Sequence, residues 1–482
     1  MTFDELLASV SSNNAPHLCF DSRLVKVGDI FVAIQGSAYD GHDFIDEALA
    51  SGAKYIVCQQ PCRHKDAEEI IVEDSAQAAA ILAQASRGNP ASQLTNLAVT
   101  GTNGKTTVAF LVRSCIQNAG LKCGLISTVI YDTGSGRSCE ATLTTPDCLT
   151  IAEMTGKMLK TGSKYMVIEA SSHALSQNRL AAIKFKAAAF TNLAGDHLDY
   201  HKTQEGYLTA KTKLFEGLSP DATAVLNKQS PESKQIAQKT KAKVLWYAVD
   251  EPADITAYIE SMNTSETVFA LETRVTGHRI QGTVKTPLLG QYNVSNHLAA
   301  AGLCLAAGFD LETIATGLSA LRTIPGRLVK LDSDRDFSVF IDYAHTDDAL
   351  RNVLATLRPL CKGKLTVVFG CGGDRDRTKR PRMARAAEQL ADFVIVTSDN
   401  PRTEQTDDII SEIVAGFENP DSRTVAVESD RKKAIGLAIK VAAKNDIVLI
   451  AGKGHETYQI IGKQKFDFSD KDIARKYLRK RK

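Results

Sequence analysis

Residues Gly101–Thr107, with the sequence Gly-Thr-Asn-Gly-Lys-Thr-Thr, combine the residue types that bind phosphate groups. An apolar run ending at Thr100 predicts a buried strand before them, and apolar residues at helical spacing predict a helix after them. The N–H groups of a helix N-terminus bind anions, Lys105 can reach the outer phosphates, and the Thr106 hydroxyl can bind Mg2+. The match to the standard phosphate-loop pattern is incomplete, because Val99 stands where its first glycine belongs. The pattern predicts an ATP phosphate site, and the alternative is a Gly/Asn turn with a solvated lysine and no ligand.

A second polar group follows a later apolar strand. The run Tyr165–Ile168 predicts a strand that ends on Glu169, where a further Mg2+ ligand could lie. A single glutamate at a strand end is more often a cap or a salt-bridge partner, so only its polar neighbours support Glu169 as a metal ligand. These neighbours share one short loop: Ser171, Ser172, His173, Gln177 and Arg179.

After the predicted strand Ala187–Phe190, residues Asp196–His201 contain two aspartates and two histidines. From their spacing they could equally form a metal cluster or begin a helix. Lys211 and Lys213 lie on a predicted helix and, taken alone, would be solvated lysines.

Polar loops also follow the strands predicted in the last third of the chain. The predicted strands are Val339–Asp342, Leu365–Phe369, Phe393–Thr397, Thr424–Val427 and Ile447–Ala451. The loops are Tyr343–His345, Cys371–Asp376, Asp399–Arg402 and Gly452–Glu456. Because ligands bind outside the carboxyl ends of the strands in an open α/β sheet, these loops predict a binding face.

The length of 482 residues predicts about three domains, because one hydrophobic core rarely extends so far. Helix-breaking residues near 89 and 325 place the domains at 1–89, 90–324 and 325–482. In the first, we expect strands and helices in a small α/β unit: Phe31–Ile34, Asp43–Ser51, Tyr55–Cys58 and Ala76–Arg87. In the others, strands alternate with helices as in a mostly parallel sheet, and 255–285 alternates like an antiparallel insertion.

The composition is that of an ordinary globular protein, with 43% hydrophobic and 24% charged residues. A net charge of +2 gives no general attraction to nucleic acid or membrane, and we expect neither as a partner. The ten cysteines lack metal-like pairing and fit a reducing cytosol. No leader-like N-terminus or membrane-length apolar run is present, so we expect a cytoplasmic protein and, further, a monomer.

Six motifs in order along the chain resemble the Mur ligases of peptidoglycan synthesis: Gly101–Thr107, Glu169–His173, Asp196–Asp199, Asn293–Asn296, Asp342–His345 and Gly452–Glu456. The resemblance implies an α/β fold of three domains: an N-terminal UDP-sugar-binding domain, a central P-loop ATPase domain with a mostly parallel sheet, and a C-terminal Rossmann-like domain. It also implies ATP-dependent amide-bond formation through an acyl phosphate. The loop Asp399–Arg402 is similar to that of the members that add meso-2,6-diaminopimelate, rather than L-lysine, to UDP-MurNAc-L-Ala-D-Glu.

The resemblance assigns residues to each substrate. It implies catalytic roles for Lys105, Glu169, His197 and Lys211, with Lys211 modified to a carbamate (N6-carboxylysine). For Mg2+ it implies Thr106, Glu169, His197 and the Lys211 carbamate. For ATP it implies Gly101, Thr102, Asn103, Gly104, Lys105, Thr106, Thr107, Asn293, Asn296, Arg327 and Asp342. For the UDP-sugar dipeptide it implies Phe20, Ser22, the loop Ser37–Tyr39, Thr144, Thr145, Ser171, Gln177 and Arg179. For diaminopimelate it implies Arg375, Asp399, Asn400, Pro401, Arg402, Gly452 and Glu456.

Two alternatives stay open at this point. One is a related ligase, either the L-lysine-adding enzyme or another enzyme of the Mur or folylpolyglutamate type. The other is a binding protein that kept the scaffold and lost catalysis. The Asp399–Arg402 loop argues against the first, and the complete set of expected metal and phosphate ligands argues against the second.

Overall fold

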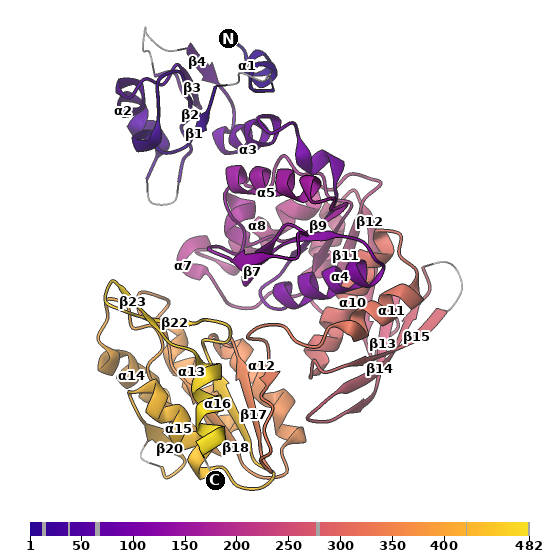
Figure 1. Ribbon diagram of the computed structural model, residues 1–482, viewed down its shortest axis with the longest axis vertical. Helices are drawn as coiled ribbons and strands as arrows, with labels where there is room; N and C mark the ends of the chain where they lie inside the picture. The colour runs from indigo at the N-terminus through magenta and orange to yellow at the C-terminus, as the bar shows by residue number, and fades with distance from the viewer. Residues whose placement is uncertain (12–15, 37–38, 63–67, 276–279, 421, 481–482) are drawn as a thin grey trace.

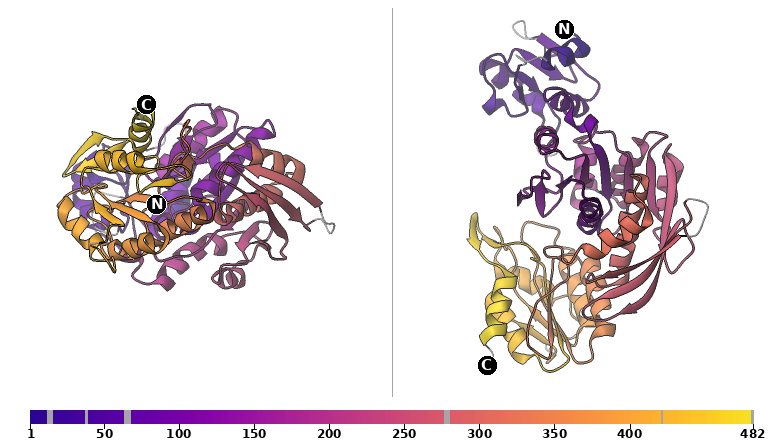
Figure 2. Two further views of the ribbon diagram at one scale, coloured as in Figure 1. Left: turned by 90° about the horizontal axis from the view of Figure 1, so that it is seen from below. Right: turned by 45° about the vertical axis from the view of Figure 1, so that its right-hand side comes forward.

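A computed structural model of the chain describes residues 1–11, 16–36, 39–62, 68–275, 280–420 and 422–480. Three α/β domains follow one another along the long axis, with the first and the last at opposite ends (Figure 1). The turned views of Figure 2 also show the central domain between them.

The N-terminal domain is built on a parallel sheet of four strands in the order β1-β2-β3-β4. The strands are β1 (Leu18–Cys19), β2 (Ile30–Val32), β3 (Tyr55–Cys58) and β4 (Glu68–Ile71), and the helices are α1 (Phe3–Val10), α2 (Ile45–Ala50) and α3 (Ser75–Ala85). The predicted strand Tyr55–Cys58 is confirmed. The predicted helix Asp43–Ser51 is instead a 3-10 turn, Gly41–Phe44, followed by α2, because the Asp40 side chain caps the turn at His42 N.

The central domain contains an eleven-stranded sheet in the order β15-β14-β13-β12-β11-β10-β5-β9-β6-β7-β8. Its strands are β5 (Thr95–Thr100), β6 (Cys123–Ile126), β7 (Ile130–Asp132), β8 (Ser138–Glu140), β9 (Tyr165–Glu169), β10 (Ala187–Phe190), β11 (Thr223–Asn227), β12 (Lys243–Val249), β13 (Ile255–Met262), β14 (Thr267–Thr273) and β15 (Ile280–Thr286). Its helices are α4 (Lys105–Asn118), α5 (Cys148–Lys160), α6 (Ser172–Ser176), α7 (Leu198–His201), α8 (Gln204–Glu216), α9 (Ser233–Lys239), α10 (Gln291–Ala306) and α11 (Leu311–Ala320). The run from β6 to β13 is parallel, and β13, β14 and β15 pair antiparallel, so the predicted antiparallel segment is confirmed.

Two apolar layers cover this sheet. Residues of α4, α10 and α11 form one core with one face of the strands, and residues of α5 and α8 form the other. The central parallel strands β5, β6, β9 and β10 are therefore buried on both sides, which explains why they are near-continuous apolar runs.

The C-terminal domain has a six-stranded sheet in the order β16-β17-β21-β18-β19-β20, parallel except for β16. The strands are β16 (Val329–Lys330), β17 (Ser338–Asp342), β18 (Leu365–Phe369), β19 (Phe393–Val396), β20 (Val425–Val427) and β21 (Ile447–Ala451). The helices are α12 (Asp347–Leu357), α13 (Lys379–Leu390), α14 (Thr406–Val414), α15 (Arg431–Val441) and α16 (Asp470–Lys480), and a separate hairpin joins β22 (Tyr458–Ile461) to β23 (Gln464–Asp467). The five strands predicted here are confirmed to within a residue or two at their ends.

The strand registers decide which loops meet. Val99 of β5 pairs with Glu169 of β9, and Thr100 of β5 pairs with Phe190 of β10, so the residues that follow these strands share one edge. In the C-terminal sheet, the loops after β17, β18, β19 and β21 likewise share an edge because these strands are parallel.

Candidate active site

The predicted phosphate loop joins β5 to α4, which begins at Lys105. Its glycines are required by close packing as well as by backbone shape. A Cβ on Gly101 would lie 1.9 Å from Thr191 Oγ1, and a Cβ on Gly104 would lie 2.2 Å from Asn296 Oδ1. Gly104 also has φ of +87°, which favours glycine.

The phosphate loop is held in place by two residues that were not predicted from the sequence. Asn192 Oδ1 accepts the Asn103 N–H at 3.0 Å, and Thr191 Oγ1 donates to the Asn103 carbonyl at 2.6 Å. Both residues follow β10 directly. The strand-end rule that selected Glu169 could therefore have selected them as well.

Two lysine side chains meet at one carbonyl of the loop. Lys105 Nζ donates to the Gly101 and Thr102 carbonyls at 2.9 and 2.8 Å, and Lys211 Nζ donates to the Gly101 carbonyl at 2.8 Å. Lys211 is only 1% exposed, so the expectation of a solvated lysine is wrong for it, whereas Lys213 is exposed. Burial, and then the charge of Lys105, hold the pKa of Lys211 well below its ordinary value. Burial therefore favours the neutral Lys211 amine, which is the form that reacts with CO2 to give a carbamate.

The predicted metal ligands Thr106 and Glu169 are in contact. Thr106 Oγ1 donates to Glu169 Oε2 at 3.2 Å, and the fully buried Glu169 carboxylate also accepts the Thr128 N–H at 2.8 Å and its hydroxyl at 3.0 Å. Hydroxyl and carboxylate oxygens are the ligands that Mg2+ prefers, so this pair fits that ion. Thr128 follows β6 closely and was not selected from the sequence.

His197 lies on the same side of the sheet, just before α7. Its Nε2 is 3.5 Å from Asp196 Oδ2, and its ring packs edge-on against His173 at 4.8 Å. Burial acts to raise the pKa of Asp196, but His197, His345 and Lys105 hold it below its ordinary value. In the described part of the chain, no group of three or more His, Cys, Asp or Glu side chains is suited to a metal. The segment begins the short helix α7 (Leu198–His201), and the Asp199 side chain lies outside the description.

Residues expected to hold the nucleotide come from both domains. Arg327 Nη2 donates to Thr106 Oγ1 at 3.0 Å, and Asn103 Nδ2 donates to Asp348 Oδ2 at 2.8 Å. Asn296 lies against Gly104, and its amide donates to Asn293 Oδ1 at 3.3 Å. The domain boundary thus closes directly over the phosphate loop.

Asp342 has a different position from the other nucleotide candidates. Its two carboxylate oxygens accept the N–H groups of Leu328 at 2.6 Å and Ala344 at 2.7 Å, and burial raises its pKa. These hydrogen bonds fix the backbone next to Arg327, so Asp342 positions that arginine.

A cleft of about 640 Å³ opens between the central and C-terminal domains. From the central domain it is lined by Thr144, Thr145, Ser171, His173, Arg179 and His197, and from the C-terminal domain by Arg375, Asp399, Asn400, Arg402, Gly452 and Glu456. Predicted sites for two substrates therefore share one cavity. Tyr343, His345 and His455 lie in the predicted binding loops, where the sequence assigned them to no ligand, and they also line the cleft. Burial lowers the pKa of both histidines to about 4.

The residues expected to hold the dipeptide form a connected group on the central side. Thr145 Oγ1 donates to the Glu169 carbonyl at 2.6 Å, and Arg179 Nη1 donates to the Thr145 carbonyl at 2.7 Å. The Arg179 guanidinium also donates to Gln177 Oε1, at 2.6 Å from Nη2. This arginine is thereby oriented at the cleft wall.

Phe20 and Ser22 are not part of this group. Phe20 packs against the N-terminal core, and Ser22 Oγ donates to Glu47 Oε2 at 2.9 Å. Ser37 and Ala38 of the expected contact loop lie outside the described residues, and Tyr39 is exposed. Asn178 Nδ2 of the central domain donates to Asp74 Oδ2 of the N-terminal domain at 2.6 Å, and this hydrogen bond joins the two domains.

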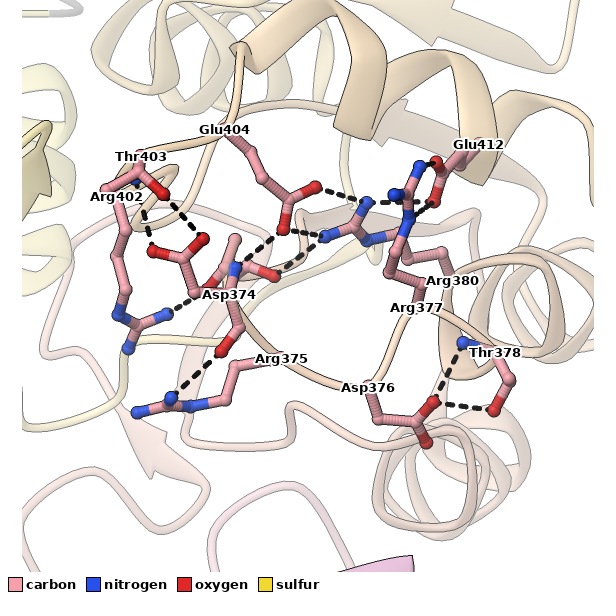
Figure 3. Close-up of polar contacts among 12 residues, drawn as sticks. Asp374, Arg375, Asp376, Arg377, Thr378, Arg380, Arg402, Thr403, Glu404 and Glu412 are labelled. Carbon is pink, nitrogen blue, oxygen red and sulfur yellow. Dashed lines mark hydrogen bonds and ion pairs between the residues drawn. The ribbon is translucent and has the colours of Figure 1, made fainter. Parts of the chain in front are cut away.

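Two loops of the C-terminal sheet carry the arginines expected to bind the amino acid (Figure 3). Arg402 Nη1 donates to the Gly373 carbonyl at 2.6 Å, and Thr403 Oγ1 donates to Asp374 Oδ1 at 2.7 Å, so the loops are fastened together. Pro401 is buried within the second loop. Burial, and then the like charge of Arg375, lower the pKa of Arg402. Two guanidinium groups so close to each other favour an anionic ligand between them.

An ion-pair network around one buried arginine lies behind these loops and was not predicted from the sequence. The Arg380 side chain is fully buried and donates to both oxygens of Glu404 at 2.9 Å and to Glu412 at 2.8 Å. Glu404 Oε1 also accepts the Asp374 N–H at 2.6 Å. Figure 3 shows this network connecting α13, α14 and both loops. It fixes the backbone that carries Arg375 and Arg402.

Comparison with known proteins agrees with this geometry. The models "Mur ligase family, catalytic domain", "Mur ligase middle domain" and "Mur ligase, glutamate ligase domain" match residues 17–90, 99–304 and 326–454. The UDP-N-acetylmuramoyl-L-alanyl-D-glutamate--2,6-diaminopimelate ligase of Geobacillus kaustophilus is 43% identical over 467 residues, which cover 96% of this chain and 94% of the relative. The chain belongs to the Mur ligase family.

Two further proteins are similar to this Mur ligase over nearly its whole length. The enzyme of the same name from Gloeobacter violaceus is 43% identical and covers 100% of this chain and 99% of its own. A solved structure of a ligase with this name has a TM-score of 0.68 at 32% identity and covers 96% of this chain and 94% of its own. This Mur ligase is accordingly an ATP-dependent enzyme that forms amide bonds and acts in peptidoglycan synthesis. Within the described ranges, no helix has the length and apolar character needed to cross a membrane.

Proposed function

We propose that this Mur ligase adds meso-2,6-diaminopimelate to the D-glutamate carboxylate of UDP-MurNAc-L-Ala-D-Glu, with ATP as co-substrate. The observation that carries the proposal is the composition of one cleft. Arg375 and Arg402 line it beside Asp399 and Glu456, opposite Arg179 and the phosphate-loop side of the central sheet. Two cations and two anions within one pocket match an amino acid whose far end carries both a carboxylate and an ammonium group.

In the proposed mechanism the protein positions the substrates and neutralises their negative charge, and it forms no covalent intermediate with them. The loop Gly101–Thr107 and Lys105 hold the triphosphate, and Arg327 approaches from the C-terminal domain. The γ-phosphoryl group of ATP passes to the substrate carboxylate, which gives an acyl phosphate and releases ADP. The neutral amino group of diaminopimelate attacks its carbonyl carbon, and the tetrahedral intermediate loses a proton from nitrogen and expels phosphate to leave the amide.

We propose that Thr106 and Glu169 hold one Mg2+ and that His197 and the carbamate of Lys211 hold a second. Bound Mg2+ supplies positive charge that offsets the phosphate oxygens during transfer. The support for the first ion is the contact between Thr106 and Glu169. The support for the carbamate is the buried Lys211 amine with its lowered pKa. A free ammonium would repel Mg2+, whereas a carbamate offers it anionic oxygens.

Three domain roles complete the proposal. Residues 1–89, with Phe20 and Ser22, hold the UDP-sugar, residues 90–324 hold ATP and the dipeptide, and residues 325–482 bring the amino acid. Asn293, Asn296 and Asp342 support the nucleotide at the boundary. The cytoplasmic location, the monomeric state and the lack of nucleic-acid and membrane partners remain predictions.

The test is an amino-acid panel with the purified full chain, ATP, Mg2+ and UDP-MurNAc-L-Ala-D-Glu. We expect phosphate release and a tripeptide product with meso-diaminopimelate, and little of either with L-lysine, D-alanine or L-glutamate. L-lysine lacks the distal carboxylate and would leave the cleft arginines without that partner. Equal use of L-lysine would contradict the selectivity, and no phosphate release with any amine would contradict the ligase reaction with this dipeptide.

A further inference from the structure

Lys453 is a fully buried lysine behind the amino-acid pocket, directly after Gly452, which lines that pocket. Its Nζ lies 2.8 Å from Asn400 Oδ1, 2.8 Å from the Tyr458 carbonyl and 3.3 Å from Glu456 Oε2. An ammonium group has three protons to donate, and these three acceptors take all of them. Lys453 therefore acts on its protein neighbours rather than on a substrate.

The first effect of Lys453 is on the orientation of Asn400. Asn400 Oδ1 accepts from Lys453 Nζ and from the Ile460 N–H at 3.0 Å, so both of its lone pairs are used. The amide nitrogen is left to point the other way, where it donates to Glu456 Oε2 at 2.9 Å. Lys453 thus decides which end of the Asn400 amide faces Glu456.

The second effect is on charge. Lys453 Nζ is 3.6 Å from Asp399 Oδ1 as well as close to Glu456, so one ammonium lies between two carboxylates. Without it, two carboxylates would share a largely buried site, and one of them would take up a proton. With Lys453 present, the three groups in their ionised forms carry a net charge of −1, which suits one substrate ammonium.

The pKa directions agree with this arrangement. Burial acts to raise the pKa of Asp399, but Lys453 and Arg431 hold it below its ordinary value. Burial, and then Asp399, raise the pKa of Glu456, while Lys453 and Asn400 act against the rise. The charged and titratable groups that face Glu456 are Asp399, Lys453, Arg402, Arg431, Tyr343 and Tyr458.

The third contact of Lys453, from its Nζ to the Tyr458 carbonyl at 2.8 Å, fastens the pocket to the start of the β22–β23 hairpin, which makes further contacts of its own. Gln459 Nε2 donates to the Asp399 carbonyl at 2.7 Å and to Ser398 Oγ at 3.0 Å. The Arg402 N–H donates to the Ile460 carbonyl at 3.1 Å, and the Gly462 N–H donates to the Arg402 carbonyl at 2.7 Å. The hairpin thus runs along the whole loop from Ser398 to Arg402. It follows residue 454, where the match to the shared C-terminal family model ends.

We propose that Lys453 is a positioning residue for binding of the incoming amino acid, because it joins Asn400, Glu456 and the β22–β23 hairpin into one pocket for a substrate ammonium. The inference rests on the proposed function, in which this cleft binds the incoming amino acid. It concerns a group that does not touch the substrate itself.

The test is Lys453→Met in the full chain, which keeps the length of the side chain and removes its charge. We expect the KM for diaminopimelate to rise by about tenfold or more, since a charge-assisted network is lost, while the KM for ATP changes less than about twofold. In the profile of kcat/KM for diaminopimelate against pH, we expect the acid limb to move to higher pH. Glu456 must be ionised to accept the ammonium, and removal of Lys453 lets it keep its proton to a higher pH.

Lys463→Met is the matched control, because this exposed lysine lies in the turn of the same hairpin. It should leave both KM values and the pH profile unchanged. If Lys453→Met does not fold, Gln459→Leu tests the hairpin instead, and we expect it to raise the KM for diaminopimelate several-fold with the KM for ATP unchanged. Wild-type values of KM and of the pH profile in Lys453→Met, or in its absence a wild-type KM in Gln459→Leu, would overturn the inference.

The wild-type enzyme separates this inference from the proposed function. If the wild type does not use diaminopimelate, the proposed function fails, and Lys453→Met is then compared on whichever amino acid the panel identifies. If the wild type uses diaminopimelate and Lys453→Met does so equally well, only the role of Lys453 fails.

Discussion

Replacing Arg402 by alanine is the most direct test of the amino-acid pocket. The alanine keeps the Cβ, so the left-handed backbone at φ of +52° is no more strained than in the wild type. What is lost is a half-buried guanidinium that lines the cleft and donates to Gly373. Truncating one partner of a hydrogen-bonded charge pair costs about 2–5 kcal/mol. Because Arg402 is only half-buried, we take about 2–3 kcal/mol, which corresponds to a fall in kcat/KM for diaminopimelate of about 30- to 150-fold.

The assay compares diaminopimelate with L-lysine in the same variant, with ADP release as the readout. L-lysine has no distal carboxylate to lose a partner, so its kcat/KM should change little. The ratio of the two should therefore fall by the same factor of about 30 to 150. The KM for ATP should stay near the wild-type value, because the phosphate loop is held by other residues. Arg385→Ala, on the exposed side of α13, is the control and should change neither value.

An equal loss with both amino acids would refute this reasoning. It would mean that Arg402 serves only to fasten its loop to Gly373. A rise in the KM for ATP as large as that for diaminopimelate would refute it as well, because the arginine would then act on the shape of the whole cleft.

Three further predictions follow from buried charges. Lys211→Ala should lower turnover by about 100-fold or more by removing the anionic oxygens of the carbamate, and bicarbonate should restore part of it in an ADP-release assay. Glu404→Gln should raise the KM for diaminopimelate and not that for ATP, and should lower the urea midpoint through a loss of about 1–3 kcal/mol, because Arg380 is left with weaker partners. Arg431→Met should lower the urea midpoint further, by a loss of about 3–5 kcal/mol, because Asp470 is left buried and unpaired by its arginine.

Each of these predictions has a control variant or an outcome that would contradict it. For Lys211 it is Lys213→Ala on the exposed side of α8, and a wild-type rate in Lys211→Ala would exclude the carbamate. For Glu404, equal changes in both KM values would mean that the network supports the domain rather than the pocket. For Arg431, the double variant with Asp470→Leu should recover most of the lost stability, and a double variant as unstable as the single one would contradict the ion-pair argument.

Much of the fold follows from local patterns in the sequence. The strand ending on Glu169, the glycines of the phosphate loop and the antiparallel segment near 255–285 were predictable, because burial and turn geometry leave their marks on neighbouring residues. The strand-end loops of the last domain were predictable for the same reason. The family resemblance rested on these same short motifs.

Other features depend on contacts between distant residues. The local pattern around Lys211 predicts a solvated side chain. In the fold this side chain is buried, because Gly101, 110 residues earlier, lies against its Nζ. The buried pairing of Arg380 with Glu404 and Glu412 likewise joins residues 24 and 32 positions apart. A charged residue on a helix looks the same in sequence whether water or a carboxylate faces it.

The sequence by itself determined the elements and the chemical groups at their ends, since hydrophobic period, glycine and proline act over a few residues. Only the tertiary structure decided that Glu169 meets Thr106, that the arginines of one domain face the dipeptide side of another, and that Lys453 lies between two carboxylates. These outcomes depend on strand register and on how the domains pack. Both are contacts between residues far apart in the chain, which a local sequence pattern does not predict.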